Sequence, residues 1–412
     1  MHDLLLKGGR VLDPANRLDG RFDVAIAGGR IAEVSPDIDP ATARRTIDVK
    51  GLRVVPGLID IHVHAHHTRA PEGFPEGLSV HIDAHGFRSG TTTVVDTGTA
   101  GPNHFEHFRS TVIDRSATRI LAFVNVVDQG MLGDWEQDPR NFVPEQAAET
   151  VARNADICVG IKTAHYRVVE PWDDLHTPWA AVDAAIRAAE ACGKPVMYDF
   201  WPRPERTYED LLLRKARPGD IHTHVYAQQF PILGPDGKPN AFLFEARRRG
   251  VIFDVGHGAA SFWFRNAEPA LRGGFGPDSI STDLHLGNVS GCVLDMTTTM
   301  GKIMAIGMPF EEVVMRSTVE PAREIGRPDL GTLSVGACAD VAVLDVRHGD
   351  FRFVDCGGGA VSSDRKIECA MTLRAGRIVF NGAGLGAPDW RDAPPEYFEC
   401  RPPGTPVRPG KA

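Results

Sequence analysis

The sequence lacks the features that mark membrane, secreted and nucleic-acid-binding proteins. No apolar run reaches membrane-spanning length, and Met1 to Lys7 contain no basic segment followed by the long apolar stretch of a signal peptide. No block of Lys and Arg is present that would neutralise a phosphate backbone, and the net charge is -9. We therefore expect a cytoplasmic protein with no membrane or nucleic-acid partner.

Paired cysteine motifs are also missing. The seven cysteines are scattered singly, without the CxxC clusters of a zinc ribbon or a redox pair. Cys158 and Cys192 lie in apolar stretches, where a free cysteine usually behaves as a small hydrophobic residue. We expect the cysteines to be reduced and mostly structural, and we assign none of them a catalytic role.

Length and composition favour one large globular domain with a small accessory one. The chain has 412 residues, of which 42% are hydrophobic and 24% charged, which are ordinary values for a folded globular protein. A TIM-type barrel with a modest second domain needs about this length.

Both ends of the chain have strand character. Short apolar segments fill residues 4–34, with Gly28-Gly29 as a hairpin turn, and similar segments recur at Ala339–Leu344 and Met371–Phe380. We predict one composite, sandwich-like β domain from residues 1–53 and 331–384, followed by an extended Pro-rich tail over residues 385–412.

Residues 54–330 alternate short apolar segments with helical patterns, which predicts an α/β fold with a parallel sheet. One such helix is expected over Ala180–Cys192, ended by Gly193. Eight candidate strands would close a (β/α)₈ barrel. They are Val54–His62, Thr92–Asp96, Arg119–Val127, Ile157–Lys162, Pro195–Asp199, Ile221–Val225, Val251–Val255 and Ser279–Asp283.

Ionisable residues end several of these strands, on the face where TIM barrels carry their active sites. The first strand ends in His62 and His64, whose i, i+2 spacing lets both imidazoles face one metal ion. By itself this pair is equally compatible with a hydrogen-bonded surface pair. Further candidates on other strands are therefore needed to favour the metal.

Three other strands supply such candidates. Lys162 ends the fourth, where its ammonium could reach water, or its amine could react with carbon dioxide to give a carbamate that bridges two metals. On the sixth strand His224 is the better ligand, whereas His222 lies deeper and suits a satisfied structural histidine. Asp283 on the eighth could bind a metal and take a proton from metal-bound water, or cap a helix.

Together with Val55–Asp60 and Gly331–Ala337, these strand-end residues resemble the amidohydrolase superfamily over nearly the whole chain. Val159–Lys162 and Phe253–Gly258 are similar to the deacetylase group often labelled dihydroorotase-like. The resemblance implies metal ligation by His62, His64, Lys162, His224 and Asp283, with Lys162 N6-carboxylated. It also implies one or two divalent ions per subunit, with zinc as the expected metal.

One position departs from that group. Where the fifth strand usually carries a metal-binding histidine, Gly193-Lys194-Pro195-Val196-Met197-Tyr198-Asp199 places Asp199. A carboxylate binds zinc well but adds negative charge, so the ion that it contacts should be a weaker Lewis acid. Three outcomes remain open: Asp199 binds the second metal, His222 helps His224 to hold it, or that metal is weakly held or absent. We favour the first and include Asp199 among the metal ligands.

By resemblance the chain is an enzyme, in which a metal-bound hydroxide attacks an amide or ester of an N-acyl or O-acyl small molecule while Asp283 manages the proton. The alternatives are a cyclic amidohydrolase, such as a dihydroorotase or hydantoinase, and a non-catalytic binding protein with an impaired second metal site. We expect a homo-oligomer. Candidate substrate-binding residues at the rim are Tyr166, Arg167, Trp201, His257 and His285.

Overall fold

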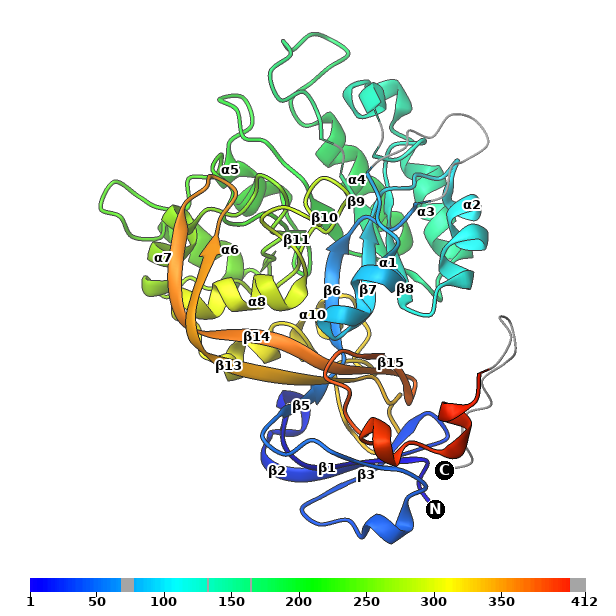
Figure 1. The fold of residues 1–412 in the computed structure, drawn as a ribbon. Helices are drawn as coiled ribbons and strands as arrows, with labels where there is room; N and C mark the ends of the chain where they lie inside the picture. The colour runs from blue at the N-terminus through cyan, green and yellow to red at the C-terminus, as the bar shows by residue number, and fades with distance from the viewer. Residues whose placement is uncertain (68–77, 132, 164, 401–412) are drawn as a thin grey trace.

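Two sheets organise the chain in the computed structural model, which describes residues 1–67, 78–131, 133–163 and 165–400 (Figure 1). One is parallel and curls into a barrel, and the other combines strands from both ends of the chain. No helix in the described ranges is long and apolar enough to cross a bilayer.

The barrel sheet contains seven parallel strands in the order β12-β11-β10-β9-β8-β7-β6. These are β6 (Leu58–Val63), β7 (Thr91–Thr97), β8 (Arg119–Asn125), β9 (Cys158–Lys162), β10 (Val196–Tyr198), β11 (Ile221–His222) and β12 (Ile252–Phe253). Single parallel bridges from Asp254 to Ser279 and from Val63 to Leu284 close the ring. This arrangement confirms the predicted α/β barrel class.

The predicted eighth strand, Ser279–Asp283, is wrong as a regular strand, because the segment forms only bridges at or beside its two ends. Side chains bind here instead: the Ser279 and Ser281 hydroxyls donate to the Asp254 carboxylate at 3.0 and 2.6 Å. Asp283 has φ of 50°, a left-handed conformation that no regular strand contains.

Helices surround the barrel and pack on its outer face, except that α10 packs against the interior cluster of the barrel. They are α1 (Ile82–His85), α2 (Phe105–Thr111), α3 (Pro144–Arg153), α4 (Ala180–Cys192), α5 (Tyr208–Asp210), α6 (Ala241–Arg248), α7 (Phe264–Arg272), α8 (Met296–Ala305), α9 (Phe310–Met315) and α10 (Val319–Glu324). The helix predicted over Ala180–Cys192 is confirmed, and Gly193 ends it in the left-handed conformation with φ of 64°.

The second sheet has the order β15-β14-β13-β5-β1-β2-β3, with β4 paired to β1. Its strands are β1 (Leu4–Asp13), β2 (Leu18–Ala27), β3 (Arg30–Ser35), β4 (Thr46–Asp48), β5 (Arg53–Pro56), β13 (Val341–Val354), β14 (Ala360–Arg374) and β15 (Arg377–Asn381). Strand β5 leads directly into β6, so the two sheets are joined where the barrel begins.

Strands β13 and β14 are much longer than the sequence predicted. They form an antiparallel hairpin that leaves the second sheet and runs along α8 and α7 (Figure 1). At its tip the backbone N–H of Cys356 donates to Phe262 O at 3.1 Å, and that of Phe264 donates to Asp355 Oδ2 at 2.9 Å. The hairpin tip is therefore anchored to the barrel.

The described part of the tail, residues 385–400, is largely exposed and contains two short 3₁₀ segments, Trp390–Asp392 and Pro395–Phe398. Each follows an Asp or Pro that favours such a turn. The proline content predicted an extended tail, but the described part is not extended throughout. Residues 401–412 lie outside the described range.

A buried carboxylate ties the barrel to the second sheet. Asp340, which directly precedes β13, pairs with Arg119 of β8 at 2.5 Å and with Arg374 of β14 at 3.2 Å. Burial opposes ionisation of Asp340, but attraction by the two guanidinium groups outweighs it and lowers the pKa of this carboxyl below its ordinary value. Its ionised form therefore stabilises the folded protein.

We predict that Asp340→Asn lowers the free energy of unfolding by about 3 kcal/mol at neutral pH, because two partly buried arginines lose their buried counter-charge. Urea unfolding measures this as a lower midpoint. Because the folded pKa is depressed, the stabilisation is present above the unfolded pKa and is lost as pH falls through the folded one. The difference between wild type and variant should therefore shrink in acid.

Asp350→Asn provides the control, since Asp350 is an exposed carboxylate on β13, the strand that Asp340 precedes. Its midpoint should stay at the wild-type value. Equal losses for the two variants would show that the pairing of Asp340 contributes nothing specific.

Candidate active site

Three predicted metal ligands lie close together where the barrel closes: His62 and His64 at the end of β6, and Asp283 in the segment beside it. The Nε2 atoms of His62 and His64 lie 3.4 and 3.1 Å from Oδ1 of Asp283. Each imidazole is 1% exposed, and no donor hydrogen-bonds to Asp283 Oδ1. Their ligand atoms are close enough together to surround a single metal ion.

Hydrogen bonds fix which nitrogen of His64 faces that point. The Thr99 hydroxyl donates its hydrogen to Asp96 Oδ2 at 2.8 Å and lies 2.7 Å from His64 Nδ1. Because a hydroxyl has one hydrogen, Thr99 must accept the Nδ1–H of His64. The lone pair of His64 is therefore on Nε2 and points toward Asp283.

His62 is oriented by an equivalent relay. The Thr223 hydroxyl donates to Asp254 Oδ2 at 2.8 Å and accepts from His62 Nδ1 at 2.8 Å. Burial, followed by the nearby Lys162 cation, holds the pKa of His62 well below its ordinary value, so this imidazole is neutral. Its Nε2 lone pair also faces Asp283.

Two imidazole lone pairs and a carboxylate oxygen thus converge in a buried space. Such a set of acceptors is repulsive unless a cation offsets it, and nitrogen and oxygen ligands at this spacing suit a divalent ion. These three ligand atoms therefore fit a metal ion.

Asp60 fixes the position of the Asp283 backbone relative to β6. Its carboxylate accepts from the backbone N–H of Thr282 at 3.0 Å and from the Thr282 hydroxyl at 2.6 Å. The residue before Asp283 is therefore bonded to the strand that carries both histidines.

A register irregularity in β9 aims Lys162 into the barrel. Val159 packs in the interior cluster and Ile161 in the outer one, although alternation would place both on one face. The pairing with β8 shifts by one residue between Cys158 and Gly160, which accounts for the change of face. Gly160 is required there, because a Cβ would lie 2.4 Å from the Phe123 ring.

Lys162 is completely buried and meets Asp199 just beyond β10. Its Nζ has no hydrogen-bond acceptor and lies 3.4 Å from Asp199 Oδ2. His224 Nε2 lies 3.7 Å from the same oxygen. His224 Nδ1 is 2.6 Å from Gly256 O and therefore donates to it, which leaves Nε2 as the ligand nitrogen.

His165 is an additional neighbour of Asp199, with its Nε2 2.8 Å from Oδ1. Burial raises the pKa of Asp199, but attraction by His165 and Lys162 outweighs this and leaves it well below the ordinary value. Lys162, Asp199, His224 and His165 therefore form a second group beside the His62–Asp283 group.

His222 does not join this second group. Its ring packs against Tyr208, Phe230 and Phe253, with ring-centroid distances of 5.0, 4.6 and 6.0 Å. Neither ring nitrogen has a hydrogen-bond partner, and burial lowers the pKa of His222 to about 3. His222 is packed among aromatic rings, but it lacks the hydrogen bonds of the satisfied structural histidine that was predicted from the sequence.

Two predicted rim residues, Tyr166 and Arg167, lie in packing contacts. The Tyr166 ring is 3% exposed and contacts the rings of Phe142 and Trp172. The Arg167 guanidinium donates to the carbonyl of Pro171. The Arg167 side chain is thus directed at its own loop, and the Tyr166 ring packs in an aromatic cluster that includes Phe142.

The other three rim residues differ in exposure. His257 is fully buried, Trp201 is 37% exposed, and the ring of His285 lies 6.2 Å from that of His64. Of these, His285 has a direct ring contact with the converging histidines.

Sequence reasoning missed the residues that support the ligands. Thr99, Asp96, Thr223 and Asp254 were not considered, although each lies at or just beyond the end of a barrel strand. His165 was also missed, although it follows Lys162 by three positions. The rule that selected the ligands, polar residues at strand ends, would have selected most of these residues too.

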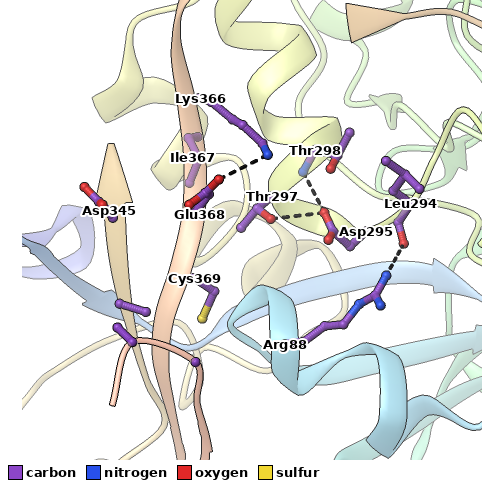
Figure 2. Close-up of a pocket in the computed structure, with 13 residues that line it drawn as sticks. Arg88, Leu294, Asp295, Thr297, Thr298, Asp345, Lys366, Ile367, Glu368 and Cys369 are labelled. Atoms are coloured by element: carbon purple, nitrogen blue, oxygen red, sulfur yellow. Dashed lines mark hydrogen bonds and ion pairs between the residues drawn. The ribbon is translucent and has the colours of Figure 1, made fainter. Parts of the chain in front are cut away.

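A separate hollow of about 440 Å³ lies where β14 passes α8 and Arg88 (Figure 2). Several of its polar groups already have partners: Lys366 contacts Glu368 at 3.1 Å, and Asp295 accepts from the backbone N–H of Thr298 at 2.8 Å, capping α8. None of the predicted site residues lines it.

The fold and the converging side chains define an α/β barrel with a candidate metal site at the carboxyl ends of its strands. Comparison with known proteins gives the family. Residues 53–216 match the model of the amidohydrolase family. A deacetylase from Agrobacterium fabrum is 32% identical over 356 residues, covering 84% of each chain. The chain therefore belongs to the amidohydrolase family and is a hydrolase.

Solved structures agree with this placement. The crystal structure of an adenine deaminase is 27% identical with a TM-score of 0.82, and it covers 93% of this chain and 100% of its own. That of a dihydroorotase is 29% identical with a TM-score of 0.76, covering 92% of this chain and 99% of its own.

We predict that Thr99→Val raises the dissociation constant of the bound metal by about 10- to 100-fold, because His64 loses the acceptor that fixes its tautomer. Competition with a chromogenic chelator measures this constant. Thr99→Ser keeps the hydroxyl and should bind metal as the wild type does. If both variants bind metal equally, the relay does not orient His64.

Proposed function

We propose that this hydrolase uses divalent metal to cleave the amide or ester bond of an N-acyl or O-acyl small molecule with water. The observation that carries the proposal is the convergence of His62, His64 and Asp283 as three buried acceptors. The similarity to a deacetylase over most of the chain supports the acyl substrate class.

The residues fall into two groups, each of which would hold one ion. His62, His64 and Asp283 would hold the first ion, and Asp199 and His224 the second, with His165 beside Asp199. Lys162, N6-carboxylated, would supply further oxygen ligands between these two groups. Zinc suits this mixture of nitrogen and oxygen ligands. A divalent cation supplies Lewis acidity, which lowers the pKa of water and polarises a carbonyl.

Asp283 is placed to move the proton. Its Oδ1 faces the two histidines, and its Oδ2 is the oxygen that can take a proton from the attacking water and deliver it to the leaving nitrogen or oxygen. Gly258 leaves room around this atom, because a Cβ there would lie 2.7 Å from Oδ2. Two of the predicted rim residues would contact the substrate: His285, whose ring lies near His64, and Trp201, which is partly exposed.

Ring opening of a cyclic amide is the second candidate reaction. The structural similarity to a dihydroorotase favours it, and the same carbonyl chemistry would serve. A shared panel separates the two: N-acyl amino acids and acyl hydroxy acids on one side, cyclic amides and imides on the other, each assayed with metal-loaded protein. No turnover together with no stoichiometric divalent metal would refute the proposed function.

On the substrate that this panel identifies, Asp283→Asn should lower kcat by about 100-fold or more, because the amide cannot take a proton from water. Metal analysis of the same sample provides the control, since an asparagine oxygen can still ligate. An undiminished kcat with unchanged metal content would show that another residue moves the proton.

A further prediction concerns the second ion. Asp199→Ala should lower the metal content from two ions per chain to one, because a buried ligand is lost. His222→Phe is the control and should keep both ions, since His222 packs against the aromatic rings of Tyr208 and Phe230. If His222→Phe loses an ion and Asp199→Ala does not, the assignment is reversed.

The carboxylation of Lys162 has its own test. After incubation with labelled bicarbonate, the wild-type protein should retain the label and Lys162→Arg should not.

A further inference from the structure

Two cysteines that are far apart in the sequence meet next to the candidate active site. Cys292 lies in the segment between Leu284 and α8, and Cys356 lies in the turn between β13 and β14. Their Sγ atoms are 3.8 Å apart. The cysteines are scattered singly along the sequence, and the long hairpin brings Cys356 to the barrel beside Cys292.

The surroundings of the pair favour a reactive thiolate. Lys302 Nζ lies 2.5 Å from the carbonyl oxygen of Cys292, which places a cation beside it. A hydrogen bond from the Cys356 thiol, together with the Lys302 charge, lowers the pKa of Cys292 to about 6, whereas the same contact raises the pKa of Cys356. Both side chains are half-buried, so small reagents can reach them.

A metal ion shared with His257 is the other arrangement to consider, because its ring also lies close. However, His257 Nε2 accepts from the Lys302 ammonium at 2.7 Å, so the hydrogen of the ring is on Nδ1, which donates to Gly258 O at 2.9 Å. Neither nitrogen lone pair is directed at the sulfurs. The geometry therefore favours a thiol pair over a metal site.

Contacts through Gly258 link the Cys292–Cys356 pair to Asp283. The two sulfurs lie 3.8 and 3.4 Å from Gly258 O. The backbone N–H of Gly258 donates to Thr282 O at 3.0 Å. Gly258 also borders Asp283 Oδ2, as shown by the 2.7 Å approach of a Cβ built there. A movement of either sulfur would therefore reach the residue that precedes Asp283.

We propose that Cys292 and Cys356 are a redox-active pair that a peroxide converts to a disulfide, and that this bond reversibly inhibits the enzyme by displacing Gly258 beside Asp283. The inhibition rests on the proposed function, whereas bond formation does not.

The chemistry balances in two steps. The Cys292 thiolate attacks one peroxide oxygen and the O–O bond breaks, so that the sulfur becomes a sulfenic acid and the released hydroxide takes a proton from solvent to form water. The Cys356 sulfur then attacks this sulfur, its proton leaves with the hydroxyl as a second water, and the S–S bond forms. The sulfurs must approach by about 1.8 Å to reach disulfide length. Both lie outside helices and regular strands, in segments that can make this adjustment.

The test treats metal-loaded full-length protein with equimolar hydrogen peroxide, in a Cys400→Ser background that removes the exposed thiol. We expect two thiols per chain to become resistant to alkylation, peptide mapping to show Cys292 linked to Cys356, and dithiothreitol to reverse the change. Cys192→Ser, a half-buried cysteine elsewhere, should behave as the parent does.

Absence of the link, a link between other cysteines, or over-oxidation of Cys292 alone would overturn the pair. So would a loss of bound metal in Cys356→Ser, or in Cys356→Ala if the serine variant does not fold, because the sulfur would then be a ligand.

The second half is measured as activity on the substrate found by the panel. Oxidation should lower kcat in the parent by on the order of tenfold to 100-fold, as expected for a small displacement of a catalytic group, and should leave Cys356→Ser unaffected. A disulfide that forms without loss of activity would refute the inhibition alone. Failure of all turnover would refute the proposed function and leave the mapped disulfide as the test of the pair.

Discussion

The Nε2 atoms of His62 and His64 each lie within 3.4 Å of the Oδ1 atom of Asp283, inside the protein. Three acceptors without a hydrogen between them repel, and burial strengthens that repulsion because little water screens it. The protein holds them in place by bonding the far side of each group: Thr99 and Thr223 accept from the imidazoles, and Asp60 holds the backbone before Asp283. The remainder of the site is organised around this arrangement.

Regular barrel geometry alone would not produce it. The one-residue shift in β9 turns Lys162 to the inside, and the left-handed conformation of Asp283 interrupts what would have been the eighth strand. Irregular backbone of this kind is tolerated because side chains replace the missing ladder bonds, as Ser279 and Ser281 do on Asp254. The departures from ideal structure lie where the chemistry is expected.

The β13–β14 hairpin links the second sheet to this centre in two places. At its base Asp340 pairs with arginines from the barrel and from β14, and at its tip residues 355 and 356 bond the backbone at 262 and 264. The second sheet therefore supplies more than a support for the chain ends. Its hairpin tip forms part of the wall next to Gly258 and places Cys356 beside Cys292.

The sequence by itself determined the barrel class, the α4 helix and the ligand candidates, because these depend on local patterns: alternating strands and helices, and polar residues that end apolar strands. It also identified Asp199 as a departure, but it left the partners of Asp199 open. Only the tertiary structure decided that His222 faces aromatic rings, that His165 and Lys162 meet Asp199, and that two isolated cysteines form a pair. Those contacts join residues that are distant in sequence, and their geometry depends on a bulge, a left-handed residue and the length of a hairpin, none of which has a periodic signal.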